Sequence, residues 1–194
     1  MTKQVSHLVQ IMNMDLRRLS KIRHLLANDI ASLLMNSLVL SKLDYCNALL
    51  PNINTDLLNK LQKVQNNAAR WILQKPRSFS SHDLLVLLHW LPVKTRIFYK
   101  ICTIVFKCLN DQGTSYLDEL INVYTPKRNL RSADDGKILV QHNVPRKIGE
   151  RSFYFSAPHF WNSLPHGLRS SSTLDRFKSN LKTFLFSDLI QVDN

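Results

Sequence analysis

Glycine is scarce in this chain of 194 residues, which has only four glycines, at positions 113, 136, 149 and 167. Loops that hold a dinucleotide or cradle phosphate groups need clustered glycines, because their backbone must turn tightly and approach the ligand closely. Four scattered glycines therefore argue against a nucleotide-dependent enzyme.

Cysteine is also scarce, with three residues at positions 46, 102 and 108 and no Cys-x-x-Cys pair. An odd number of cysteines in apolar surroundings favours buried free thiols in a reducing compartment over a disulfide framework. No apolar run approaches the ~20 residues of a membrane span, and the first residues do not lead into a signal-peptide core. We expect an intracellular protein of the cytoplasm or nucleus that is not bound to membrane.

The sequence also lacks the residue spacings that are typical of metal sites and catalytic sites. The seven histidines include no His-x-x-x-His pair and no partner cysteine at zinc-ligand spacing, so we expect neither metal nor cofactor. The adjacent acids Asp134 and Asp135 fall in a polar loop, whereas two-metal catalysis needs carboxylates on rigid elements. We therefore expect no enzymatic activity from this chain.

Acidic residues are few, 14 against 26 lysines and arginines, which gives a net charge of +12. Between residues 60 and 107 the only acid is Asp83, whereas nine residues in that window are basic: 60, 63, 70, 75, 77, 94, 96, 100 and 107. Such a concentration favours nucleic acid as the partner. A solvated basic surface and an anionic membrane surface are the alternatives.

Apolar residues recur at helical spacing through most of the chain, which predicts a mainly α protein. We expect helices over residues 5–26, 28–50, 55–73 and 92–110, short helices at 84–88 and 116–122, and a final helix from residue 173. Residues 124–172 are rich in turn-forming residues and predict irregular structure with short strands. Trp161, between two prolines in that stretch, is an anchor that pins it to a core or, as the alternative, a platform for base stacking.

Two predicted helices carry basic strips. In helix 55–73, cations and amides lie opposite the apolar face, and in helix 92–110 three cations form the only polar edge of an otherwise apolar element. If the two strips lie on one side of the molecule, they could follow a phosphate backbone. We predict that nucleic acid binds Lys60, Lys63, Asn67, Arg70, Arg96, Lys100 and Lys107. An ordinary solvated helix face is the alternative.

Six segments of the chain match one family in unbroken order between about Leu16 and Phe186. They are SKLDYCNALL (41–50), LQKVQNNAARWIL (61–73), LHWLPVKTRIFYKI (88–101), YTPKRNLRS (124–132), GERSFYFSAPHFWNSLP (149–165) and FKSNLKTFLF (177–186). Together they resemble the C-terminal region of reverse transcriptases encoded by non-LTR (LINE-type, jockey-like) retrotransposons.

This resemblance implies a helical thumb-like domain over residues 1–122 and a C-terminal extension over 123–194. The catalytic palm, with its aromatic-x-Asp-Asp hairpin, is missing from the chain. The resemblance thus implies a fragment of an RNA-directed DNA polymerase whose partners are the missing palm and a template-primer duplex of RNA and/or DNA. The rival hypothesis is a helical protein-interaction module derived from a mobile element. The sequence leaves the oligomeric state open.

Overall fold

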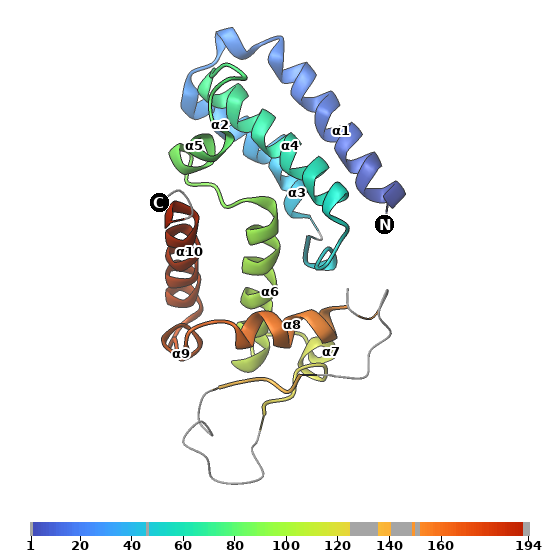
Figure 1. Ribbon diagram of the computed structural model, residues 1–194, viewed down its shortest axis with the longest axis vertical. Helices are drawn as coiled ribbons and strands as arrows, with labels where there is room; N and C mark the ends of the chain where they lie inside the picture. The colour runs from blue at the N-terminus through green and yellow to red at the C-terminus, as the bar shows by residue number, and fades with distance from the viewer. Residues whose placement is uncertain (1, 46, 125–135, 141–148, 150–151, 192–194) are drawn as a thin grey trace. The chain divides into compact units, whose positions relative to one another are not determined.

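The computed structural model describes residues 2–45, 47–124, 136–140, 149 and 152–191, and these residues are mainly helical (Figure 1). The predicted mainly α fold is confirmed. The chain folds into two compact units: Met1–Asn47 with Ile53–Arg96 form unit 1, and Ala48–Asn52 with Ile97–Asn194 form unit 2. The expected division at residues 122 and 123 does not coincide with this boundary and stays a prediction about domains.

Unit 1 is built around the pairing of two long helices, α1 and α4. Its elements are α1 (Thr2–Ser20), the 3₁₀ helix η1 (Arg23–Leu25), α2 (Asn28–Met35), the π-helical turn η2 (Asn36–Leu40), α3 (Ser41–Asp44), α4 (Thr55–Leu73) and α5 (Ser81–Leu87). A short 3₁₀ helix, η3 (Asn47–Leu49), follows α3. α1 packs along α4, with α2, η2 and α3 also packed on α1 or α4 (Figure 1).

The segment from α2 to α3 contains a π-helical turn, which the sequence analysis did not predict. Four of its buried residues, Ala31, Met35, Val39 and Leu43, are spaced four apart. In a regular α-helix of 3.6 residues per turn, each step of four overshoots by about 40°, so the apolar line would rotate away from the core. The wider π turn at Asn36–Leu40 corrects this rotation and keeps the four side chains on one side.

Two amide side chains of α4 fix the start of the next long helix, α6 (Val93–Leu109). The fully buried Gln65 donates from Nε2 to the Leu91 carbonyl at 2.9 Å, and Gln62 Oε1 accepts from the Val93 N–H at 2.9 Å. Gln62 Nε2 also donates to Gln65 Oε1 at 3.0 Å. The first N–H groups of a helix have no hydrogen-bond partner within that helix, and Gln62 of α4 supplies an acceptor for one of them.

Unit 2 contains α6 from Ile97 onward, α7 (Ser115–Asp118), α8 (Phe153–Asn162), α9 (His166–Arg169) and α10 (Leu174–Gln191). Aromatic rings form much of its core. Phe106 of α6 stacks on Phe177 of α10, with ring centroids 4.5 Å apart, and Phe98 lies 5.0 Å from Phe160 of α8.

Trp161 is an anchor, as the preferred prediction held. Its side chain is 1% exposed, and its ring centroid lies 5.6 Å from that of Phe177. Its indole Nε1 donates to the Gly136 carbonyl at 2.8 Å. The neighbouring Asn162 pairs through both amide atoms with the backbone of Ile138, at 2.9 and 2.8 Å. Together these contacts hold segment 136–138 against α8.

The prediction of irregular structure with short strands over residues 124–172 is wrong for part of that stretch. Residues 153–162 form α8, although Pro158 lies within it, and the Ser152 hydroxyl caps its start by accepting from the Phe155 N–H at 3.3 Å. The only β pairing among the described residues is an isolated bridge between Val123 and Ile138. Proline and aromatic content misled the prediction, because the capping and tertiary contacts that stabilise this helix do not appear as a periodic pattern.

The residue that adopts the left-handed conformation after α6 is Asp111, with φ of 55°, and not the glycine at position 113. Gly113 is needed for close packing instead: a Cβ at this position would lie 2.2 Å from Asp118 Oδ1 and 2.9 Å from the backbone α-carbon of Cys108.

Candidate nucleic-acid interface

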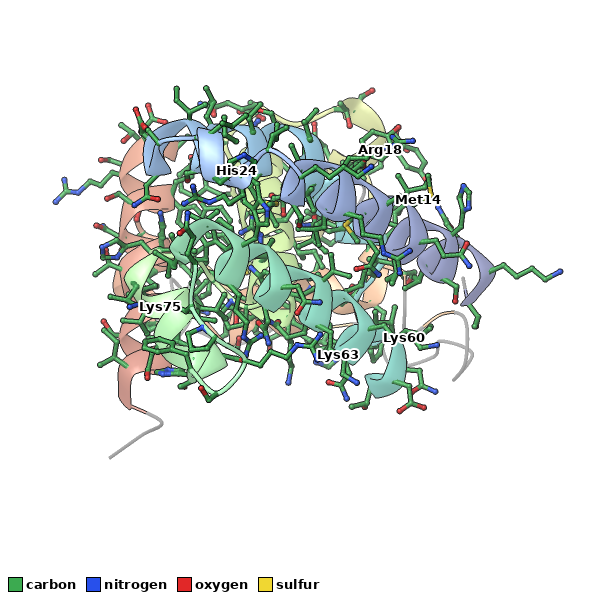
Figure 2. All side chains as sticks on the ribbon, turned by 90° about the horizontal axis from the view of Figure 1, so that it is seen from above. Met14, Arg18, His24, Lys60, Lys63 and Lys75 are labelled. Atoms are coloured by element: carbon green, nitrogen blue, oxygen red, sulfur yellow. The ribbon has the colours of Figure 1, made fainter. Side chains whose placement is uncertain are left out.

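Three of the predicted site residues project freely from α4. Lys60, Lys63 and Asn67 are exposed, and their spacing of three and four residues places them along one line of the helix. Figure 2 shows Lys60 and Lys63 at the same edge of α4. Neither lysine has an ion pair with another described residue, so both charges are available to a ligand.

Arg70, on the same face of α4, is engaged within unit 1. The side chain is half-buried, and its Nη2 donates to Ser81 Oγ at 2.7 Å and to the Phe79 carbonyl at 3.3 Å. These bonds hold the turn that leads into α5. Arg70 therefore has a structural task that the helical pattern did not reveal.

Arg96 is neutralised by a carboxylate. Its Nε donates to Asp44 Oδ1 at 2.9 Å, and its Nη2 contacts Asp44 Oδ2. Two parallel bonds of this kind form the bidentate geometry in which arginine and carboxylate pair most strongly. Phosphate could bind Arg96 only in competition with Asp44.

The remaining two predicted residues belong to unit 2. Lys100 is exposed and Lys107 half-buried, and between them Thr103 is buried, its hydroxyl donating to the Tyr99 carbonyl at 2.7 Å. The polar strip of α6 is therefore less open than its sequence suggested. The requirement that the strips of α4 and α6 lie on one side of the molecule stays a prediction.

A second basic cluster lies at the end of α1. Arg17, Arg18 and Lys21 are all exposed, and the sequence analysis did not include them in the site. The one acid in α1, Asp15, is only 15% exposed and contacts Lys42 of α3 as well as Arg18 at 3.4 Å. The signal that could have identified this cluster is the absence of acids on the outer side of α1.

Unit 1 as a whole carries thirteen lysines and arginines against five aspartates. Two of these aspartates, Asp15 and Asp44, are held in ion pairs with cations of the same unit. Most of the positive charge of unit 1 therefore has no acidic partner, and such a basic surface is typical of proteins that bind polyanions.

Within the described part of the chain, the groups that could bind a metal or act as a nucleophile are poorly placed for either role. No three His, Cys, Asp or Glu side chains within the described ranges are grouped to hold a metal ion. Burial raises the pKa of the Cys102 thiol and, with the nearby Asp118, the pKa of Cys108 to about 12, so neither is a ready nucleophile. Asp134 and Asp135 lie outside the described residues.

None of the helices within the described ranges has the length and apolar character that crossing a membrane requires. Comparisons with protein family models, with curated protein sequences and with solved structures find no match to this chain.

Proposed function

We propose that this chain binds nucleic acid through the phosphate backbone, as the thumb and post-thumb region of a non-LTR retrotransposon reverse transcriptase. The observation that carries the proposal is the uncompensated charge of unit 1, where Lys60 and Lys63 stand exposed without acidic partners among the described residues. The resemblance supports it, because a thumb would hold a template-primer duplex. The chain would act in the cell interior and without catalytic activity of its own.

Of the predicted site residues, four lysines are the best candidates for phosphate contact: Lys60, Lys63, Lys100 and Lys107. Each phosphate neutralised on a B-form duplex contributes about −0.9 to the slope of log K against log salt, so four contacts give a slope of roughly −3.6. Arg70 and Arg96 add to this slope only if they release their internal partners.

The test is a salt titration of binding to a short RNA–DNA duplex. Replacing Lys60, Lys63 and Lys100 together with glutamine should reduce the slope by about 2.7, whereas replacing them with arginine should preserve it. Circular dichroism establishes that each variant is folded. Binding that is equally strong in the glutamine variant, with an unchanged slope, would refute this surface.

The proposed lack of catalysis is tested by primer extension with Mg²⁺. Pure protein should incorporate no nucleotides, since two-metal catalysis needs grouped ligands and no three His, Cys, Asp or Glu side chains of the described residues are grouped to hold a metal ion. Incorporation abolished by changing Asp134 and Asp135 would contradict the proposal.

A protein-interaction module is the second candidate, and one observation favours it. Unit 1 exposes large apolar side chains on and near α2 and α3: Leu25 is 73% exposed, Leu33 61% and Tyr45 79%. Exposed large apolar side chains supply contacts at many protein–protein interfaces. Failure of the wild-type chain to bind any duplex at low salt would favour this candidate.

A further inference from the structure

The outer side of α1 is basic and free of acids at its C-terminal end. Arg17, Arg18 and Lys21 lie within little more than one helical turn, and the Arg18 side chain is 72% exposed. Asp15 does not neutralise the cluster, because it turns towards Lys42 and contacts only Arg18 among the three. Like charges this close repel one another, since they lie within the ~8 Å screening length of physiological salt.

Helix stability explains part of this arrangement. Cations in the last turn of a helix interact favourably with its dipole, which accounts for Arg17 and Arg18. Lys60 and Lys63, in contrast, lie in the first half of α4, nearer to the positive end of that helix. The dipole of α4 gives them no stabilisation, so their presence needs another reason.

The packing of α1 on α4 brings the two groups of cations into a single two-helix layer. Figure 2 looks down on this layer and shows Arg18 at its α1 edge and Lys60 and Lys63 at the opposite, α4 edge. Neither helix offers an exposed aromatic ring on which bases could stack: α1 has no Phe, Tyr or Trp, and Trp71 of α4 is half-buried. The chemistry of the layer therefore suits phosphates rather than bases.

We propose that α1 and α4 together form the phosphate-binding face of unit 1. Arg17, Arg18 and Lys21 contact the backbone of the same nucleic acid that Lys60 and Lys63 contact. This inference rests on the proposed function and moves the interface within unit 1 from Arg70 and Arg96, which are engaged internally, to the end of α1.

The experiment compares two matched pairs of substitutions in the full chain. Arg17→Gln with Lys21→Gln removes two charges from α1, and Arg176→Gln with Lys182→Gln removes one arginine and one lysine, both exposed, from α10. Binding to an RNA–DNA duplex is measured by fluorescence anisotropy between 50 and 300 mM salt. Melting temperatures are measured to show that both variants are folded.

The α1 pair should reduce the salt slope by about 1.8 and weaken binding at 0.1 M salt on the order of 50-fold, and the α10 pair should do neither. If the wild type binds with a steep salt slope but the two pairs behave alike, the inference is overturned while the proposed function stands. If the wild-type chain shows no salt-dependent binding at all, the proposed function itself fails. If the chain binds no duplex but binds phosphatidylserine vesicles, and the α1 pair weakens that binding, the ligand is a membrane surface, and both the inference and the proposed function are overturned.

Discussion

Arg23 offers the sharpest test of how unit 1 is held together. It is a buried arginine, 8% exposed, and the described part of the chain gives it no acidic partner. Its guanidinium donates instead to three backbone carbonyls: Nε to Trp71 at 3.0 Å, Nη2 to Ile72 at 2.7 Å and Nη1 to Leu26 at 2.7 Å. Arg23 thus caps the C-terminal end of α4, where carbonyls have no partner in the helix and the dipole is negative.

The expected effect of Arg23→Ala follows from these three bonds. Each hydrogen bond to a charged donor contributes about 1.5–3 kcal/mol, and a buried carbonyl left without a donor loses that contribution. Water can reach part of the site, so we expect the free energy of unfolding to fall by about 3–5 kcal/mol rather than by the full sum. For a chain of this length that corresponds to a melting temperature lower by about 6–20 °C. Arg23→Lys retains the charge but not the planar set of donors, so its free energy of unfolding should fall by roughly half as much as that of Arg23→Ala.

The assay is thermal and urea unfolding followed by circular dichroism. Arg17→Ala is the matched control, because Arg17 is an exposed arginine six residues earlier and should change stability by no more than about 0.5 kcal/mol. If Arg23→Ala destabilises the protein no more than Arg17→Ala does, then the carbonyls at the end of α4 do not depend on this guanidinium and the reasoning is refuted.

Three further predictions concern unit 2. Trp161→Ala should lower stability by about 3–5 kcal/mol because the ring fills the core, whereas unchanged melting with lost nucleic-acid binding would instead support a stacking role. Gly113→Ala should lower the melting temperature clearly, since its Cβ would lie 2.9 Å from the backbone α-carbon of Cys108, and a melting curve identical to wild type would contradict this close approach. In a Cys46→Ala variant, no thiol should react with Ellman's reagent at pH 8 in the native state and two should react in urea, because burial raises the pKa of Cys102 and Cys108. Unfolded thiols ionise near pH ~8.5, so the stability due to these two residues is complete below that pH and decreases as the pH rises towards 12.

Local residue patterns were sufficient to identify the segments that form the long helices. The apolar periodicities of α1, α4, α6 and α10 come from their own residues, so no tertiary information was needed to predict them. Boundaries were less secure: the first helix was expected to reach residue 26 but ends at Ser20, and Arg23, in the 3₁₀ helix that follows, donates to the end of α4. The helix at 153–162 was missed although Ser152 is a typical capping residue, since the contacts of the helix with Phe177 and Ile138 come from residues distant in sequence.

For the candidate interface, the number of charges can be read from the sequence, whereas the contacts made in the fold establish which of these charges remain available to a ligand. Lys63 and Arg70 occupy equivalent positions on the outer strip of α4, yet one is exposed and the other is bonded to the turn before α5. Arg96 is paired with Asp44, fifty-two residues earlier in the chain. Helical spacing specifies the direction in which a side chain leaves its helix, whereas its bonding partner depends on the residues that the fold brings next to it. For this reason the cations of α1 became candidates only when the structure showed that Arg70 and Arg96 are bonded internally.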